Sequence, residues 1–298
     1  MSVVATLFWF FVGGGLVWLG AFFLWCVIGK LSCGVVLGAV VPSVIVFGIA
    51  GICGSVEITA GIIWGAVTFN FALVGLLYLC FGMRVERTSS LLTLLWVGLG
   101  FGACFVAGRH GRLGMCGGWG LLVVGLVAVW KMWTRQKETS TETPTESCLA
   151  CHRFGWCGRL VLAVMLIGLG AWLMVWRHGV VAAVLKLPDS WCGALVMAPL
   201  CGLTFILGLR WRKKWQASTF TVGLMRANVL LVTVGLGLVA VLNGGLPLTQ
   251  STLTVTLPWV SGLAVMTTVA SYLPQKTARW WGGLVLALYL GYVVSLLG

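Results

Sequence analysis

The chain has 298 residues, of which 60% are hydrophobic and 8% are charged, and its mean hydropathy is +1.07. A soluble domain carries about 25% charged residues, so the composition excludes an ordinary water-soluble protein and indicates a polytopic membrane protein. The net charge of +13 fits basic loops that orient membrane helices, and it does not indicate a nucleic-acid-binding protein.

Charged residues and Gly/Pro clusters divide the chain into ten apolar segments. Most are close to the roughly 20 residues that a helix needs to cross a bilayer, and they are too long for the strands of a membrane barrel. The first charge is Lys30, so the first segment lacks the basic start of a signal peptide and is expected to be a span. The expected spans are 3–28, 32–53, 58–82, 89–107, 114–133, 159–184, 190–209, 218–243, 252–274 and 280–297.

One strongly hydrophilic tract, RQKETSTETPTESC, lies between the fifth and sixth spans. Its Thr/Glu-rich composition and Pro144 predict a disordered linker. The chain then divides into a first five-helix unit (1–133), a linker (134–158) and a second five-helix unit (159–298).

Lys and Arg are distributed unevenly between the two sides of this arrangement. The connections after odd-numbered spans hold 14 of them and the other connections hold four. Basic residues accumulate on the cytoplasmic side, so we expect a cell or inner membrane protein with both termini outside and the linker cytoplasmic.

Short sequence matches recur between the two units in the same order. GAVTFN, which ends at Asn70, is matched by GLMRAN, which ends at Asn228, 158 positions later. LGAFFLW is matched by LGAWLMVW, and GAVVP, which ends at Pro42, by GALVMAP, which ends at Pro199. Because each unit has an odd number of spans, a duplication predicts two copies of opposite orientation, an arrangement common in secondary transporters.

These segments resemble the α-repeats of the calcium/cation antiporters, a family that includes the sodium/calcium exchangers. That pattern reads roughly GTSLPE, an apolar helix, a loop and GNxxGSNxFN. The matching positions are Pro42, Gly61, Gly65, Phe69 and Asn70 in the first copy, and Pro199, Gly223 and Asn228 in the second. The resemblance implies an all-α membrane fold of ten helices in two inverted five-helix repeats, and cation antiport as the activity.

The chain departs from the family pattern at its charged positions. The motif glutamate, which the resemblance implies as the main cation ligand, falls on Ser43 and Leu200, and the family's other asparagines fall on Ile62 and Val67. The whole chain has six acidic residues, none of them deep in an expected span. Calcium takes six to eight oxygen ligands, including carboxylates, so we expect a degenerate site with poor calcium binding.

The remaining polar side chains at membrane depth are the candidates for a transport path. They are Ser43, Thr68, Asn70, Thr204 and Asn228. These residues could line a path for a monovalent ion or a neutral solute, or they could form hydrogen bonds that hold the helices together. Arg226 lies within the eighth span, where it either extends to the cytoplasmic surface or acts as a tethered cation in place of a mobile ion.

The sequence CLACHRFGWC brings together Cys148, Cys151, His152 and Cys157. CxxCH is the string for covalent haem attachment, but that chemistry belongs to an outside compartment and the expected topology places the tract inside. A small zinc site is a second reading. A reduced linker without a metal is the default, and no cofactor is expected.

The sequence therefore predicts a secondary transporter that exchanges a small cation through a degenerate site. The alternatives are a non-transporting membrane scaffold with the exchanger fold, and a drug/metabolite-type transporter, whose termini usually both lie inside. No set of residues for catalysis by an enzyme is found. The expected partners are the lipid bilayer and a transported cation or solute, with no nucleic acid, and the oligomeric state is left open.

Overall fold

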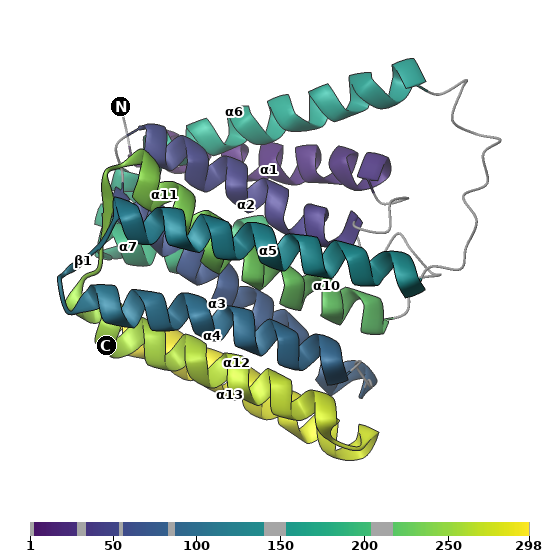
Figure 1. Cartoon of the computed structure of the whole chain (residues 1–298). Helices are drawn as coiled ribbons and strands as arrows, with labels where there is room; N and C mark the ends of the chain where they lie inside the picture. The colour runs from purple at the N-terminus through teal and green to yellow at the C-terminus, as the bar shows by residue number, and fades with distance from the viewer. Residues whose placement is uncertain are drawn as a thin grey trace.

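A computed structural model describes residues 3–28, 34–53, 56–82, 87–139, 153–203 and 217–297. These residues form a bundle of helices with one small pair of strands (Figure 1). In chain order the elements are α1 (Val3–Ile28), α2 (Gly34–Ile52), α3 (Val56–Phe81), α4 (Arg87–Gly108), β1 (Arg112–Gly114), α5 (Met115–Thr139), α6 (Arg153–Leu185), α7 (Asp189–Cys192), the π-helix η2 (Gly193–Met197), α8 (Ala198–Gly202), α10 (Ala217–Leu230), the π-helix η3 (Leu231–Gly235), α11 (Leu236–Leu242), β2 (Gly245–Pro247), the π-helix η4 (Thr252–Thr256), α12 (Leu257–Tyr272) and α13 (Gln275–Leu297).

Seven of these helices or continuous helical runs are long and apolar enough to cross a membrane. Two shorter apolar helices, Val36–Ile52 and Met115–Lys131, lie at two further expected spans. The expected span 190–209 is described as far as Leu203, where α7, η2 and α8 follow one another. The chain is thus an all-helical membrane protein, and nine of the ten expected spans coincide with described helices.

The helix ends differ from the expected spans mainly around the hydrophilic tract. Helix α5 continues to Thr139 and α6 begins at Arg153, so both extend into the region assigned to the linker. Charged residues such as Lys137 are good helix formers, so a helix can continue beyond its apolar part into water. Residues 140–152 lie outside the described part of the chain.

The two ends of the chain lie at the same end of the bundle (Figure 1). The C-terminal end of α5 and the N-terminal end of α6 both lie at the opposite end. A chain whose first and last helices begin and end on one side crosses the bundle an even number of times. This agrees with two units that each have an odd number of spans.

Helix α3 is the central helix, with a nearly continuous buried stretch from Ile58 to Val74. It crosses α7 and η2 at very short range, because a Cβ atom on Gly65 would lie 2.4 Å from the Ala194 carbonyl oxygen. On the other side α3 packs against α13, where a Cβ on Gly282 would lie 2.5 Å from the Gly75 oxygen. Glycines on these faces allow helix backbones to touch, which is how membrane helices gain packing energy without a hydrophobic driving force.

At the end that carries the termini, β1 and β2 pair in antiparallel fashion, with Leu113 opposite Leu246. The pairing joins the α4–α5 connection to the connection that follows α11. Gly111 has φ +71° and Gly245 has φ +141°, backbone conformations that residues with a side chain rarely adopt. The strands therefore hold two loops from different halves of the chain together.

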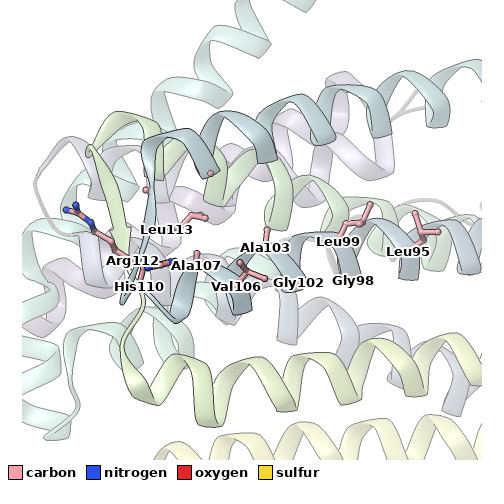
Figure 2. A pocket seen from close by; sticks show the side chains of 12 residues that line it. Leu95, Gly98, Leu99, Gly102, Ala103, Val106, Ala107, His110, Arg112 and Leu113 are labelled. Carbon is pink, nitrogen blue, oxygen red and sulfur yellow. The ribbon is translucent and has the colours of Figure 1, made fainter.

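A lateral groove of about 910 Å³ lies between α4, β1 and α5 (Figure 2). Aliphatic side chains and glycines of α4 line most of it. His110 and Arg112 lie at one end of the groove, beside the strands.

Candidate transport site

The candidate site begins where α3 and α10 meet. The Asn70 amide nitrogen Nδ2 donates a hydrogen bond of 2.9 Å to Oδ1 of Asn228, 158 positions later in the chain. Both side chains are buried, with 3% and 0% of their surface exposed. Asn70 and Asn228, which the sequence matches identify as counterparts, are thus in direct contact. This is expected for positions near a pseudo-two-fold axis.

The asparagine pair is not fully satisfied. Nδ2 of Asn228 is buried and has no hydrogen-bond partner among the described residues. A buried amide without a partner costs about 1–3 kcal/mol, so such a group needs either a bound partner or a compensating gain elsewhere. The Tyr78 hydroxyl and the Trp64 ring nitrogen of α3 are likewise buried without a hydrogen-bond partner among the described residues.

A second polar cluster lies two residues before Asn70. The Thr68 hydroxyl donates to the carbonyl oxygens of its own helix, at 2.9 Å from that of Gly65. The Tyr292 phenol of α13 also interacts with the hydroxyls of Thr68 and Thr256. Sequence reasoning selected Thr68 but missed Thr256 and Tyr292, although a tyrosine inside an apolar span is itself a signal of a buried polar contact.

The other candidate residues are less closely placed. Ser43 is buried on α2, with 2% of its surface exposed. Arg226 is half-buried on α10 and precedes Asn228 by two residues. Two residues turn a helix by about 200°, so the Arg226 and Asn228 side chains leave α10 on nearly opposite sides. Thr204 lies outside the described residues.

Of the four candidate zinc ligands, the structure describes one. Cys157 is exposed near the start of α6, whereas Cys148, Cys151 and His152 lie outside the described residues. The default of a linker without a metal and the alternative of a zinc site therefore both stay untested.

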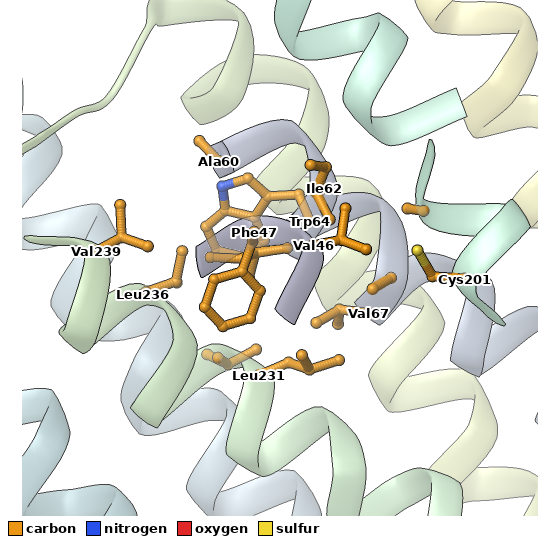
Figure 3. Packing of buried hydrophobic residues seen from close by; sticks show 14 of the residues in the cluster. Val46, Phe47, Ala60, Ile62, Trp64, Val67, Cys201, Leu231, Leu236 and Val239 are labelled. Carbon is orange, nitrogen blue, oxygen red and sulfur yellow. The ribbon is translucent and has the colours of Figure 1, made fainter. Parts of the chain in front are cut away.

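Hydrocarbon fills the interior one helical turn away from each asparagine. Phe47 of α2, Ile62 and Val67 of α3 and Leu231 of η3 belong to one buried apolar cluster (Figure 3). All four are at most 1% exposed. Ile62 and Val67 are the positions onto which the family's asparagines fall, so aliphatic groups occupy the centre where the resemblance implies amides.

The acidic residues that the structure describes all lie near helix ends. Glu57 is exposed in the first turn of α3, Glu138 is in the last turn of α5, and Asp189 begins α7. The Asp189 carboxylate lies 3.8 Å from Nε2 of His178. Within the described part of the chain, the oxygen atoms available at the centre therefore belong to amides, hydroxyls and backbone carbonyls.

No family model matches the chain, and no curated protein matches it. Several solved structures, in contrast, match the chain over nearly its whole length. A structure of the sodium-calcium exchanger NCX_Mj soaked with Na⁺ and Sr²⁺ is 18% identical, with a TM-score of 0.68 over 99% of this chain and 100% of the exchanger. The H⁺/Ca²⁺ exchanger CAX is 12% identical, with a TM-score of 0.69 over 99% of this chain and 88% of that one.

These likenesses show the fold. The chain is an all-helical membrane protein with the architecture of the sodium/calcium and proton/calcium exchangers, as the repeat resemblance predicted. The similar structures are of transporters rather than enzymes.

Proposed function

We propose that this protein is a secondary transporter that exchanges a small cation across the membrane. The observation that carries the proposal is the hydrogen bond between Asn70 and Asn228, a buried amide contact at the centre of an exchanger fold. Inverted repeats place substrate sites near the midplane, where the repeats meet. The Nδ2 of Asn228, which has no partner among the described residues, supports this proposal because it leaves a donor at the contact that a transported species or water can use.

The proposed cation is monovalent rather than calcium. Amide and hydroxyl oxygens can replace water around an ion of single charge, whereas a divalent ion needs carboxylates to offset the cost of leaving water. The described acids lie near helix ends, which supports poor calcium binding.

Flux into proteoliposomes tests the proposal. The purified protein would be reconstituted and given sodium, potassium, calcium or proton gradients in turn, and uptake of each ion would be followed. We expect flux of a monovalent ion or proton and little calcium flux. The double variant Asn70→Leu/Asn228→Leu, which removes both amides at once, should abolish that flux.

Thr254→Val is the matched control, because Thr254 is exposed and its hydroxyl donates to the Gln250 carbonyl of its own helix. It should retain normal flux. Equal flux in the double variant and in the control would contradict the proposed path.

A non-transporting scaffold is the second candidate, and the apolar centre favours it. Phe47, Ile62 and Leu231 belong to one buried apolar cluster between α2, α3 and η3. A path closed by hydrocarbon needs these side chains to move before an ion can pass. Absence of flux with all four gradients, from protein that remains folded, would establish the scaffold reading.

A further inference from the structure

The groove between α4 and α5 opens sideways, toward the region where the membrane would lie. Leu95, Leu99 and Val106 line it and are 57%, 51% and 63% exposed. A Cβ atom on Gly98 or Gly102 would meet nothing within 4 Å, so the floor of the groove is open space. Between α12 and α13, by contrast, a Cβ on Gly291 would lie 2.8 Å from the Trp259 ring.

The length of the groove matches one leaflet of a bilayer. From Leu95 to Ala107 the α4 backbone rises about 18 Å at 1.5 Å per residue. Half of the hydrocarbon core is about 15 Å thick. An acyl chain that begins at the level of Ala107 can therefore run along the groove to the middle of the membrane.

The charges in the groove are confined to its aqueous end. Arg112 extends beyond the helices, and His110 lies beside Ala107 (Figure 2). The rest of the lining is aliphatic or glycine, and the described lining residues include no acid. A basic end on an apolar trough complements a molecule with an anionic head and a hydrocarbon tail.

We propose that this groove binds an anionic phospholipid, with the phosphate headgroup at Arg112 and His110 and an acyl chain along α4. The site is separate from the Asn70–Asn228 contact and does not depend on transport. It lies in the leaflet at the end of the bundle that carries both termini.

Native mass spectrometry of the purified full chain tests the proposal. The protein would be equilibrated with equal amounts of phosphatidylglycerol and phosphatidylcholine, and the bound lipids would be counted. We expect one phosphatidylglycerol to be retained in preference to phosphatidylcholine. Arg112→Gln should reduce that preference about five-fold, the effect of about one basic side chain near a membrane surface. Arg109→Gln is the matched control, because Arg109 is in the turn that precedes β1 but does not line the groove.

Filling the groove gives an independent arm. Gly102→Leu places a side chain in the open floor and should remove the bound lipid of either kind, whereas Gly15→Leu on α1, also in open space, should not. Equal retention of both lipids by the native protein, or no change with Arg112→Gln and Gly102→Leu, would overturn the proposal. Loss of a dimer in Gly102→Leu without loss of lipid would assign the groove to a second copy of this chain instead.

Discussion

At the scale of single residues, the two buried asparagines are the polar side chains on which the stability and the proposed transport path both depend. An amide inside a membrane is expensive unless another group accepts and donates its hydrogen bonds. Asn70 and Asn228 meet this need partly in each other, because Nδ2 of Asn70 donates to Oδ1 of Asn228 and the second amide keeps one donor without a partner among the described residues. Each asparagine therefore lowers the free-energy cost of burying the other.

A double-mutant cycle measures this dependence. Asn70→Leu and Asn228→Leu should each destabilise the protein by about 1–3 kcal/mol, because each leaves one amide buried alone. The double variant should lose less stability than the sum of the losses in the two single variants. The difference, the coupling energy, should be about 0.6–1.7 kcal/mol, as measured for hydrogen bonds between membrane helices. Unfolding of the purified protein in mixed detergent gives the free energies.

Thr267→Val is the control for this cycle, because the Thr267 hydroxyl donates to carbonyls of its own helix, at 2.8 Å from that of Leu263. It should change stability little. Strict additivity of the two asparagine substitutions would show that the hydrogen bond contributes nothing.

Arg226 gives a second prediction at this scale. Because Arg226 and Asn228 face nearly opposite sides of α10, we expect Arg226→Leu to retain cation flux in proteoliposomes, with Arg226→Lys as the variant that keeps the charge. Loss of flux in Arg226→Leu together with normal flux in Arg226→Lys would instead support a tethered cation in the path.

At the scale of elements, the α1–α6 contact shows how closely two matched helices approach. A Cβ on Gly13 would lie 2.7 Å from the Gly170 carbonyl oxygen, and a Cβ on Gly170 would lie 2.5 Å from the Gly13 oxygen. Each glycine thus fits against the backbone of the other helix. The contact is reciprocal, so an added side chain on either helix should disturb it equally.

This reciprocity predicts paired outcomes. Gly13→Ala and Gly170→Ala should each cost about 1–3 kcal/mol, the usual effect of forcing an extra methyl group into a packed interface. Gly15→Ala and Gly168→Ala lie two residues away on the same helices and meet open space, so they should be neutral. Thermal unfolding in detergent compares the four variants, and equal melting temperatures for all of them would contradict the packing described here.

At the scale of the whole molecule, the basic residues and the positions of the chain ends together predict an orientation. Both termini lie at one end of the bundle, and α5 ends and α6 begins at the other (Figure 1). The excess of Lys and Arg that the sequence carries in the connections after odd-numbered spans, including the one between α5 and α6, favours the cytoplasm for that side.

Reporter fusions measure this orientation. A reporter active only outside the cytoplasm should be active when fused to either terminus, and inactive when inserted within residues 140–150. The inverse result, with both termini inside, would contradict the orientation that the basic residues predict. Reporters of opposite activity at the two termini would contradict the shared end seen in the structure.

The sequence predicted the helical membrane fold closely, because long apolar runs interrupted by charges leave a membrane chain few alternatives. The matched segments even identified Asn70 and Asn228 as counterparts, and the structure shows them in contact. The π-helical segments were not predictable, since a bulge depends on tertiary packing more than on local sequence. Tyr292 was missed for a related reason, because its partners Thr68 and Thr256 lie far away in the chain.

The asparagine contact also bears on how such a chain arises. In a symmetric dimer, a residue on the two-fold axis touches its own copy in the other subunit. Under the proposed duplication, Asn70 and Asn228 descend from one position, so their hydrogen bond is the contact that a single ancestral asparagine would have made with itself. One amide donates and the other accepts in this single hydrogen bond, so two identical side chains from two copies play different parts in one fused chain.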